Sequence, residues 1–262
     1  MRVLVTNDDG IYAPGIVILA KFLAEAGHEP VVVAPDRERS SVGHAITLTR
    51  PLRLQPLSGG PYPDVVKAYA CDGTPSDCVV LGLDEVAPEI AIVFSGVNRG
   101  PNVGDDLTYS GTVSAAMEGL VFGRTSVAFS LNCKPDGEEQ LYETAGAFAV
   151  HLLEWLGTHP LPQGVLLNVN VPNLPLSLIK GVQVTRKGTR AYEGKVNRLQ
   201  DPHGRTYYWV AGRPEDEMVE GTDVWAVAHG YISVTPVHLD MTHYPSVEAL
   251  CGQGLTELDL EN

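Results

Sequence analysis

Short runs of apolar residues recur along the chain, and each is followed by a turn and then, in most cases, by a segment with the spacing of an amphipathic helix. Strands buried on both faces have such continuous apolar sequences, and parallel strands are joined by crossover helices. The runs lie at residues 3–5, 31–33, 90–94, 126–129 and 165–171. This alternation predicts an α/β fold in which a doubly wound, mostly parallel sheet carries helices on both faces.

The helical segments carry start and stop signals. Pro14 stands where a helix can begin, and Gly27 is suited to ending it. The sequence TPSD at residues 74–77 supplies an N-cap, a proline at the first helical position and an acid in the first turn. Helical periodicity also spans residues 110–123 and, most clearly, residues 138–155.

The pattern changes after about residue 180. The aromatic run at residues 207–209 and the segment 231–234 have strand character, and an acidic stretch lies between them. We predict a core at residues 1–180, a hairpin-like extension at 181–230 and a return segment at 231–262. Because an isolated hairpin is only marginally stable in water, we expect the extension to pack against, or exchange with, a partner subunit in at least a dimer.

The charge balance excludes some partners. The net charge is −14, whereas nucleic acid polymers and anionic membranes require a basic face. No apolar stretch approaches the roughly 20 residues of a membrane span, and no signal-peptide pattern opens the sequence, so we expect a cytoplasmic protein. The four cysteines have no metal-binding or redox spacing and are expected to be reduced thiols.

Polar side chains follow three of the predicted strands. Asp8 and Asp9 come directly after the first, the loop with Ser40 follows the second, and the loop with Asn98 follows the strand at 90–94. Ligands of an open α/β sheet bind outside the carboxyl ends of its strands, so we expect these loops to meet at one rim. Adjacent carboxylates repel each other unless a cation or protons intervene, and oxygen ligands suit Mg²⁺ or Mn²⁺. A divalent-metal site is therefore predicted, with a solvated acidic turn as the simpler alternative.

The turn at Ser110, Gly111 and Thr112 opens a predicted helix. Small residues there leave free N–H groups and the positive end of the helix dipole, which suit a phosphate group. Ordinary N-capping by Ser110 is an alternative that is compatible with phosphate binding. His44 is a candidate general acid or phosphate contact, with a purely structural role as its alternative.

Several motifs together resemble those of the SurE family, the survival protein E nucleotidases. In chain order they are MRVLVTNDDGI at residues 1–11, VAPD at 33–36, RSS at 39–41 with GH at 43–44, GTPSDC at 73–78, SGVNRGPN at 95–102 and SGTVSAA at 110–116. The sequence YISVTP at residues 231–236 continues the likeness. The motifs are specific as a set and follow the order of the family.

The resemblance implies a metal-dependent phosphatase that acts on nucleoside 5′- and 3′-monophosphates and, in some relatives, on short polyphosphate. It implies that Asp8 and Asp9 bind the divalent ion and carry catalysis, with the Ser40 hydroxyl and the Asn98 side-chain oxygen as further ligands. The implied substrate contacts are Asn98, Ser110, Gly111, Thr112 and His44. A Rossmann-like core is also implied, with a homodimer or homotetramer built through a C-terminal β-hairpin extension.

Two questions stay open at this point. The attacking group is either a water held by the ion or the Asp8 carboxylate. A phospho-receiver-like signalling module, which also carries paired acids after its first strand, is the alternative function. Such a module needs a lysine after a late strand, and the nearest candidate, Lys134, lies beyond Asn132 and Cys133. A dinucleotide-binding enzyme is disfavoured because no Gly-x-Gly-x-x-Gly follows the first strand.

Overall fold

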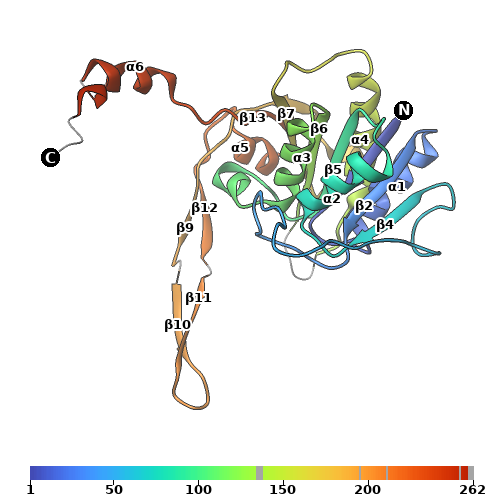
Figure 1. Ribbon diagram of the computed structural model, residues 1–262, viewed down its shortest axis with the longest axis horizontal. Helices are drawn as coiled ribbons and strands as arrows, with labels where there is room; N and C mark the ends of the chain where they lie inside the picture. The colour runs from blue at the N-terminus through green and yellow to red at the C-terminus, as the bar shows by residue number, and fades with distance from the viewer. Residues whose placement is uncertain (134–137, 195, 211, 254, 259–262) are drawn as a thin grey trace.

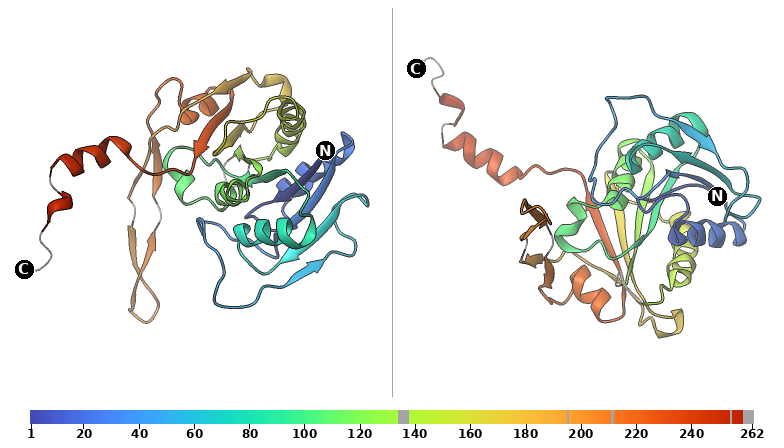
Figure 2. Two further views of the ribbon diagram at one scale, coloured as in Figure 1. Left: turned by 45° about the horizontal axis from the view of Figure 1, so that its top comes forward. Right: turned by 90° about the horizontal axis from the view of Figure 1, so that it is seen from below.

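The computed structural model describes residues 1–133, 138–194, 196–210, 212–253 and 255–258. Within these ranges a nine-stranded sheet has helices on both sides, and a long two-stranded ribbon stands out from it (Figures 1 and 2). The sheet is mostly parallel. The predicted α/β, doubly wound fold class is therefore confirmed.

The six central strands are all parallel and lie in the order β4-β2-β1-β5-β6-β7. Their bounds are β1 Arg2–Thr6, β2 Glu29–Pro35, β4 Lys67–Cys71, β5 Ile92–Arg99, β6 Thr125–Asn132 and β7 Val165–Pro172. The direction of winding reverses between β1 and β5. Loops that leave two such strands run to opposite faces of the sheet and leave a crevice between them.

Three further strands lie at the two edges of the sheet. β3 (Leu54–Pro56) pairs antiparallel with β4 at one edge. At the other edge, β13 (Ile232–His238) runs antiparallel to β7, and β8 (Val182–Val184) runs parallel to β13. Residues 182–184, which begin the segment predicted as an extension, thus lie in the core sheet.

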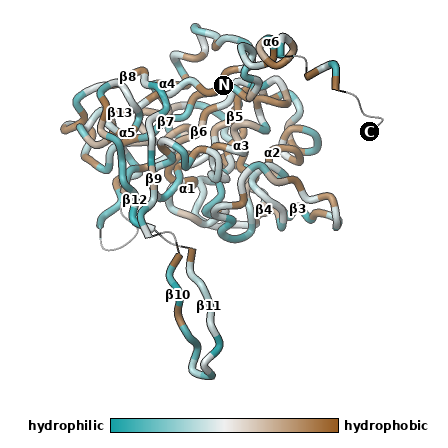
Figure 3. The backbone as a smooth tube through the Cα atoms, turned by 90° about the vertical axis from the view of Figure 1, so that its left-hand side faces the viewer, coloured by the Kyte–Doolittle hydropathy of each residue, from teal (hydrophilic) through white to brown (hydrophobic). Residues whose placement is uncertain are grey.

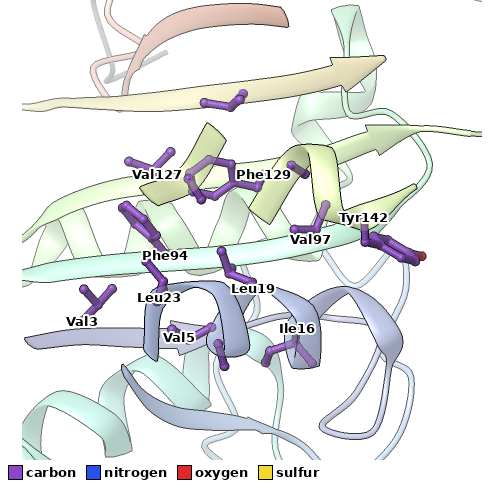
Figure 4. Packing of buried hydrophobic residues seen from close by; sticks show 14 of the residues in the cluster. Val3, Val5, Ile16, Leu19, Leu23, Phe94, Val97, Val127, Phe129 and Tyr142 are labelled. Atoms are coloured by element: carbon purple, nitrogen blue, oxygen red, sulfur yellow. The ribbon is translucent and has the colours of Figure 1, made fainter. Parts of the chain in front are cut away.

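Helices α1 (Pro14–Glu25) and α4 (Tyr142–Leu156) cover one face of the sheet, and α2 (Pro75–Leu81) and α3 (Gly111–Val121) cover the other. Along β1, Val3 and Val5 face the α1 side (Figure 4), whereas Leu4 packs on the α2 side. Phe94 and Phe129 meet edge to face at the centre, with ring centroids 4.9 Å apart. Both faces are therefore buried, which explains the uninterrupted apolar runs.

The helix starts follow the local signals, with one difference. Pro14 is the first residue of α1, and Thr74 and Asp77 form a reciprocal capping box at α2. The helix predicted from residue 138 begins instead at Tyr142. Asn173 accounts for the delay, because its side chain accepts a hydrogen bond from the Leu141 amide and donates one to the Glu139 carbonyl.

Strand β5 runs farther than its apolar residues indicate. It passes through a register shift between Ser95 and Asn98, and then Asn98 and Arg99 pair with Ser130 and Leu131 of β6. Gly96 makes this possible, since a Cβ there would lie 2.3 Å from the Phe129 carbonyl oxygen. The polar motif predicted as a loop is in part the end of a strand.

The ribbon consists of β9 (Arg190–Glu193) paired with β12 (Arg213–Asp216), and β10 (Val196–Gln200) paired with β11 (Thr206–Val210). Its outer half stands clear of the core (Figure 3), and Tyr208 and Trp209 are both 60% exposed. The chain then forms α5 (Asp223–Ala228), returns through β13, and continues into α6 (Tyr244–Gly252), which projects away from the sheet (Figure 1).

The remaining turns of helix are short. They are η1 (Gly82–Val86), η2 (Gly104–Thr108), η3 (Leu176–Leu178) and η4 (Leu255–Glu257). In the part of the chain that is described, no helix is long and apolar enough to cross a membrane. The four cysteines are free thiols.

Candidate active site

The turn after β1 presents two carboxylates at the crevice between β1 and β5. Asn7 closes this turn, because its side chain donates to the Gly10 carbonyl at 2.9 Å and accepts from the Gly10 amide at 3.2 Å. Asp8 and Asp9 lie within the closed turn, and both line the pocket described below. The sequence NDDG is thus a turn that presents acids.

Asp8 is 4% exposed, and its Oδ1 accepts a 2.5 Å hydrogen bond from the Thr112 hydroxyl in the first turn of α3. Burial raises the pKa of Asp8 to about 7, and the neighbouring charge of Asp9 adds to the increase. Burial also raises the pKa of Asp9, although the Arg99 amide donates to its Oδ2 at 2.9 Å. A cation bound beside Asp8 and Asp9 would lower both pKa values, because it would stabilise the charged carboxylates.

The N-terminus of α3 lies directly against Asp8. A Cβ added to Gly111 would lie 2.8 Å from the Asp8 Cβ and 2.9 Å from its Oδ2, so glycine permits the approach. Ser110 is the N-cap, and its hydroxyl accepts from the Val113 amide at 3.1 Å. Ser110 therefore caps α3. Because Ser110 also lines the pocket, this end of the helix borders the pocket.

The loop after β2 brings Ser40 and Ser41 to the same pocket. The Arg39 amide donates to the Asp8 carbonyl at 2.7 Å, which fixes the loop beside the acidic turn. The Ser40 hydroxyl donates to Glu38 Oε1 at 2.7 Å. Ser41 adopts a left-handed backbone with φ of 57°, a strained conformation for a residue other than glycine.

Asn98 completes the rim from the end of β5. Its side-chain nitrogen donates to the Gly100 carbonyl at 2.9 Å, which leaves the amide oxygen on the opposite side of the group. Asn98 and Arg99 both line the pocket. The three loops that the sequence expects to converge therefore do meet.

The pocket has a volume of about 720 Å³. Four of its lining residues are acids, and the lining contains one arginine, Arg99. The lining residues are Asp8, Asp9, Glu38, Ser40, Ser41, Asn98, Arg99, Pro101, Asn102, Asp106, Tyr109, Ser110, Tyr192, Val210 and Gly212. An anionic ligand would meet net negative charge here unless a cation were bound first.

Three candidate substrate contacts lie outside this lining. Gly111 and Thr112 sit behind it against Asp8. His44 Nε2 lies 2.7 Å from Glu118 Oε2, an interaction that holds the Ser40 loop against α3. Their roles in substrate binding stay predictions. Lys134, the lysine considered for a receiver-like module, lies outside the described residues.

Three lining residues come from the segment predicted as an extension: Tyr192, Val210 and Gly212. Sequence reasoning missed them because they are remote from every motif and reach the pocket only through the course of the ribbon. Tyr192 follows no predicted core strand, so no local pattern marks it. Asp106, by contrast, lies in the polar loop that contains Asn98, which is predicted to reach the rim.

The donor set fits a hard divalent ion. Two carboxylates, a hydroxyl and an amide oxygen border one pocket, at Asp8, Asp9, Ser40 and Asn98. Among the residues that are described, no group of three or more His, Cys, Asp or Glu side chains could hold a metal. The four residues Asp8, Asp9, Ser40 and Asn98 offer oxygen ligands, which hard divalent ions prefer. They include no histidine or cysteine, the residues that supply the nitrogen and sulfur ligands preferred by zinc.

Comparisons with known proteins show which family the chain belongs to. The family model described as "Survival protein SurE" matches residues 3–194. The chain is 49% identical to "5′-nucleotidase SurE" of Geobacter metallireducens over 262 residues, which are 99% of this chain and 100% of the relative. It is also 49% identical to "5′-nucleotidase SurE 1" of Thermus thermophilus, covering 96% of this chain and 97% of that protein.

A solved structure is similar throughout. The SurE protein from Aquifex aeolicus superposes with a TM-score of 0.83 at 41% sequence identity, and the match covers 98% of this chain and 100% of that one. The match therefore extends over nearly the whole length of both chains.

Proposed function

Because this chain belongs to the SurE family, we propose that it is a 5′-nucleotidase that depends on a divalent metal ion and hydrolyses nucleoside monophosphates to nucleoside and phosphate. The names of its relatives support a nucleotidase, and this favours hydrolysis with turnover over a receiver-like module that holds a phosphoryl group.

One observation carries the proposal for the site. Asp8 is buried beside Asp9 and against the N-terminus of α3, at the crevice between β1 and β5. Two crowded carboxylates favour a cation, whereas a helix N-terminus favours an anion. A phosphate ester bound together with a divalent ion satisfies both preferences at one place.

Each group of residues at the site has a separate role in the proposed reaction. Asp8, Asp9, Ser40 and Asn98 would hold Mg²⁺ or Mn²⁺, which supplies a positive charge that polarises the phosphoryl group. Thr112 orients the Asp8 carboxylate through its hydrogen bond. The amides at the start of α3, with Ser110 as N-cap, stabilise negative charge on the phosphoryl oxygens. Such catalysis consists largely of positioning and electrostatics.

Further parts of the proposal are narrower. We propose activity on 3′-monophosphates and short polyphosphate as well, action in the cytoplasm, and a homodimer or homotetramer built through the ribbon. The exposed aromatic residues of β11 support the last of these.

The test is phosphate release from 5′- and 3′-monophosphates and from short polyphosphate, with Mg²⁺, with Mn²⁺ and with a chelator. We expect many turnovers per chain with a divalent ion and none in chelator. Asp9→Asn should lower the rate at least about a hundredfold, whereas Asp84→Asn, at an exposed acid in η1, is the matched control. Equal rates in chelator, or a single stable phosphoryl group per chain, would contradict the proposal.

A further inference from the structure

A cluster of charged side chains joins the base of the ribbon to the segment that leads into α3. Arg190, at the start of β9, binds Asp216 of β12 through Nε and Nη2 at 2.6 and 2.7 Å. Its Nη1 donates to Asp106 Oδ2 at 3.0 Å. The side chains of Arg190, Asp106 and Asp216 are 10%, 17% and 18% exposed, so one guanidinium spans two largely buried carboxylates.

Asp106 is the link to the pocket. Tyr192, the second residue along β9 from Arg190, donates its hydroxyl to Asp106 Oδ1 at 2.7 Å, so the ribbon holds both carboxylate oxygens. The Asp106 carbonyl accepts from the amides of Tyr109 and Ser110 at 3.0 and 3.1 Å. The position of Asp106 therefore sets the position of the residue that caps α3.

The same segment also touches the Ser40 loop. The Gly43 amide donates to the Tyr109 carbonyl at 3.2 Å. A displacement of Asp106 would thus move two parts of the pocket, the cap of α3 and the loop that carries Ser40. Two further hydrogen bonds strengthen the link between the start of η2 and the segment that precedes the ribbon, because buried Asp223 accepts from the amides of both Gly104 and Gly188.

Charge gives Arg190 a second effect. Asp106 lines the pocket, and Arg190 is the cation that pairs with it. Without the guanidinium, a largely buried carboxylate would face the place where an anionic substrate binds, and only the neutral Tyr192 hydroxyl would remain as its side-chain partner. Loss of Arg190 should therefore weaken the binding of an anion more than it weakens the fold of the distant sheet.

From these contacts we infer that Arg190 is a positioning residue for the nucleotidase site: it holds Asp106, and through Asp106 it fixes the start of α3 and neutralises the wall of the pocket. The inference rests on the proposed function for its kinetic readout. It assigns the base of the ribbon a part in substrate binding that is separate from subunit association.

The experiment compares Arg190→Gln, Arg190→Lys and Tyr192→Phe with the wild type. We expect Arg190→Gln to raise KM for a nucleoside 5′-monophosphate about tenfold, with kcat changed less than about threefold, since positioning and charge act mainly on binding. Arg190→Lys keeps the charge but loses the two-pronged contact, so it should restore part of the affinity. Lys21→Gln, an equal charge change on α1, should leave KM unchanged.

Hydrogen exchange supplies a readout that does not depend on turnover. In Arg190→Gln, amides in residues 104–114 should exchange faster than in the wild type, while those of β1 and α1 should not. Tyr192→Phe removes a single hydroxyl and should change KM and exchange in the same direction by a smaller factor.

The outcomes are distinct. A folded Arg190→Gln variant with wild-type KM and wild-type exchange overturns the inference, as does an equal rise in KM for Lys21→Gln. If Arg190→Gln does not fold, unchanged KM and exchange in Tyr192→Phe overturn it instead. A wild type without hydrolysis contradicts the proposed function, and faster exchange at 104–114 would still support the link from Arg190 to α3.

Discussion

Gly111 and Asp8 lie so close that a β-carbon on residue 111 would stand 2.8 Å from the β-carbon of Asp8. The first turn of α3 and the acidic turn after β1 therefore form one packed unit, held further by the Thr112 hydroxyl. A change on either side of this contact must displace the other.

Gly111→Ala should keep the fold and damage the site. The added methyl group must push Asp8 aside, so we expect kcat/KM to fall at least about tenfold. Steady-state kinetics with a nucleoside monophosphate measure the effect. Gly252→Ala, where nothing lies within 4 Å of the added atom, is the matched control and should keep wild-type kinetics. Wild-type kinetics in folded Gly111→Ala would remove this contact from the site.

Asp8→Asn should separate stability from metal binding. The neutral amide relieves the repulsion between Asp8 and Asp9, so the metal-free variant should melt at or above the wild-type temperature. The wild type should gain about 2.7 kcal/mol at a metal concentration a hundredfold above Kd, and the variant less. Thermal melting with and without Mn²⁺ measures both. A loss of about 1 kcal/mol with or without metal would instead indicate a structural cap.

In the metal-free wild type, the contribution of Asp8 to stability should fall as the pH rises from about 4 to about 7. The pKa of Asp8 is raised to about 7 by burial, so in this window the folded state binds its proton more tightly than the unfolded state. The contribution is full below pH 4 and is lost above pH 7. Its upper bound is roughly 4 kcal/mol, at 1.36 kcal/mol per pKa unit.

Urea unfolding of the wild type and of Asp8→Asn across this range isolates the contribution, because the other titrating groups are common to both proteins. The difference in unfolding free energy between them should change steadily with pH in favour of the variant. A constant difference would show that Asp8 keeps an ordinary pKa.

Ser41→Gly should stabilise the protein slightly. Relief of the left-handed strain at φ of 57° is worth roughly 1–2 kcal/mol, and the extra chain entropy of glycine costs about 0.5–1 kcal/mol. The expected gain is therefore between about 0 and 1.5 kcal/mol. Ser246→Gly, within α6, lacks that relief and should destabilise by roughly 0.5–1 kcal/mol. Equal losses in both variants would show that residue 41 is unstrained.

Removing the outer ribbon should lower the oligomeric mass. Residues 196–210 carry Tyr207, Tyr208 and Trp209, which are 41%, 60% and 60% exposed, and Figure 3 shows β10 and β11 standing clear of the sheet. Sedimentation of the full chain at micromolar concentration should give at least a dimer. A chain with this segment replaced by a short turn should sediment at a lower mass. A monomeric full chain would contradict the prediction.

Much of the core could be predicted because its signals are local. Pro14 and the capping box of Thr74 and Asp77 mark helix starts with their own side chains. The apolar runs reflect burial on both faces, as at Val3, Leu4 and Val5. The meeting of the three loops at one rim could be predicted from the topology, since the carboxyl ends of parallel strands lie at the same edge of a sheet.

The features that could not be predicted depend on contacts between residues far apart in the sequence. Asn173 delays α4 from across a loop, and Gly96 lets β5 continue past its apolar residues. Helix α5 is only six residues long, too short to show a clear period. Tyr192 and Val210 reach the pocket only because the ribbon starts beside η2, and neither residue carries a local mark of that position.

The hydrogen bond from the Arg99 amide to Asp9 joins residues that are 90 positions apart. During synthesis, the acidic turn therefore emerges long before the strand and the helix that complete its surroundings. The proposed ion could not guide the early collapse of such a chain, because its full set of proposed ligands exists only after β5 has docked beside β1 and Ser40 has joined the rim. Metal would then act late in folding, and it would stabilise molecules whose central sheet is already assembled.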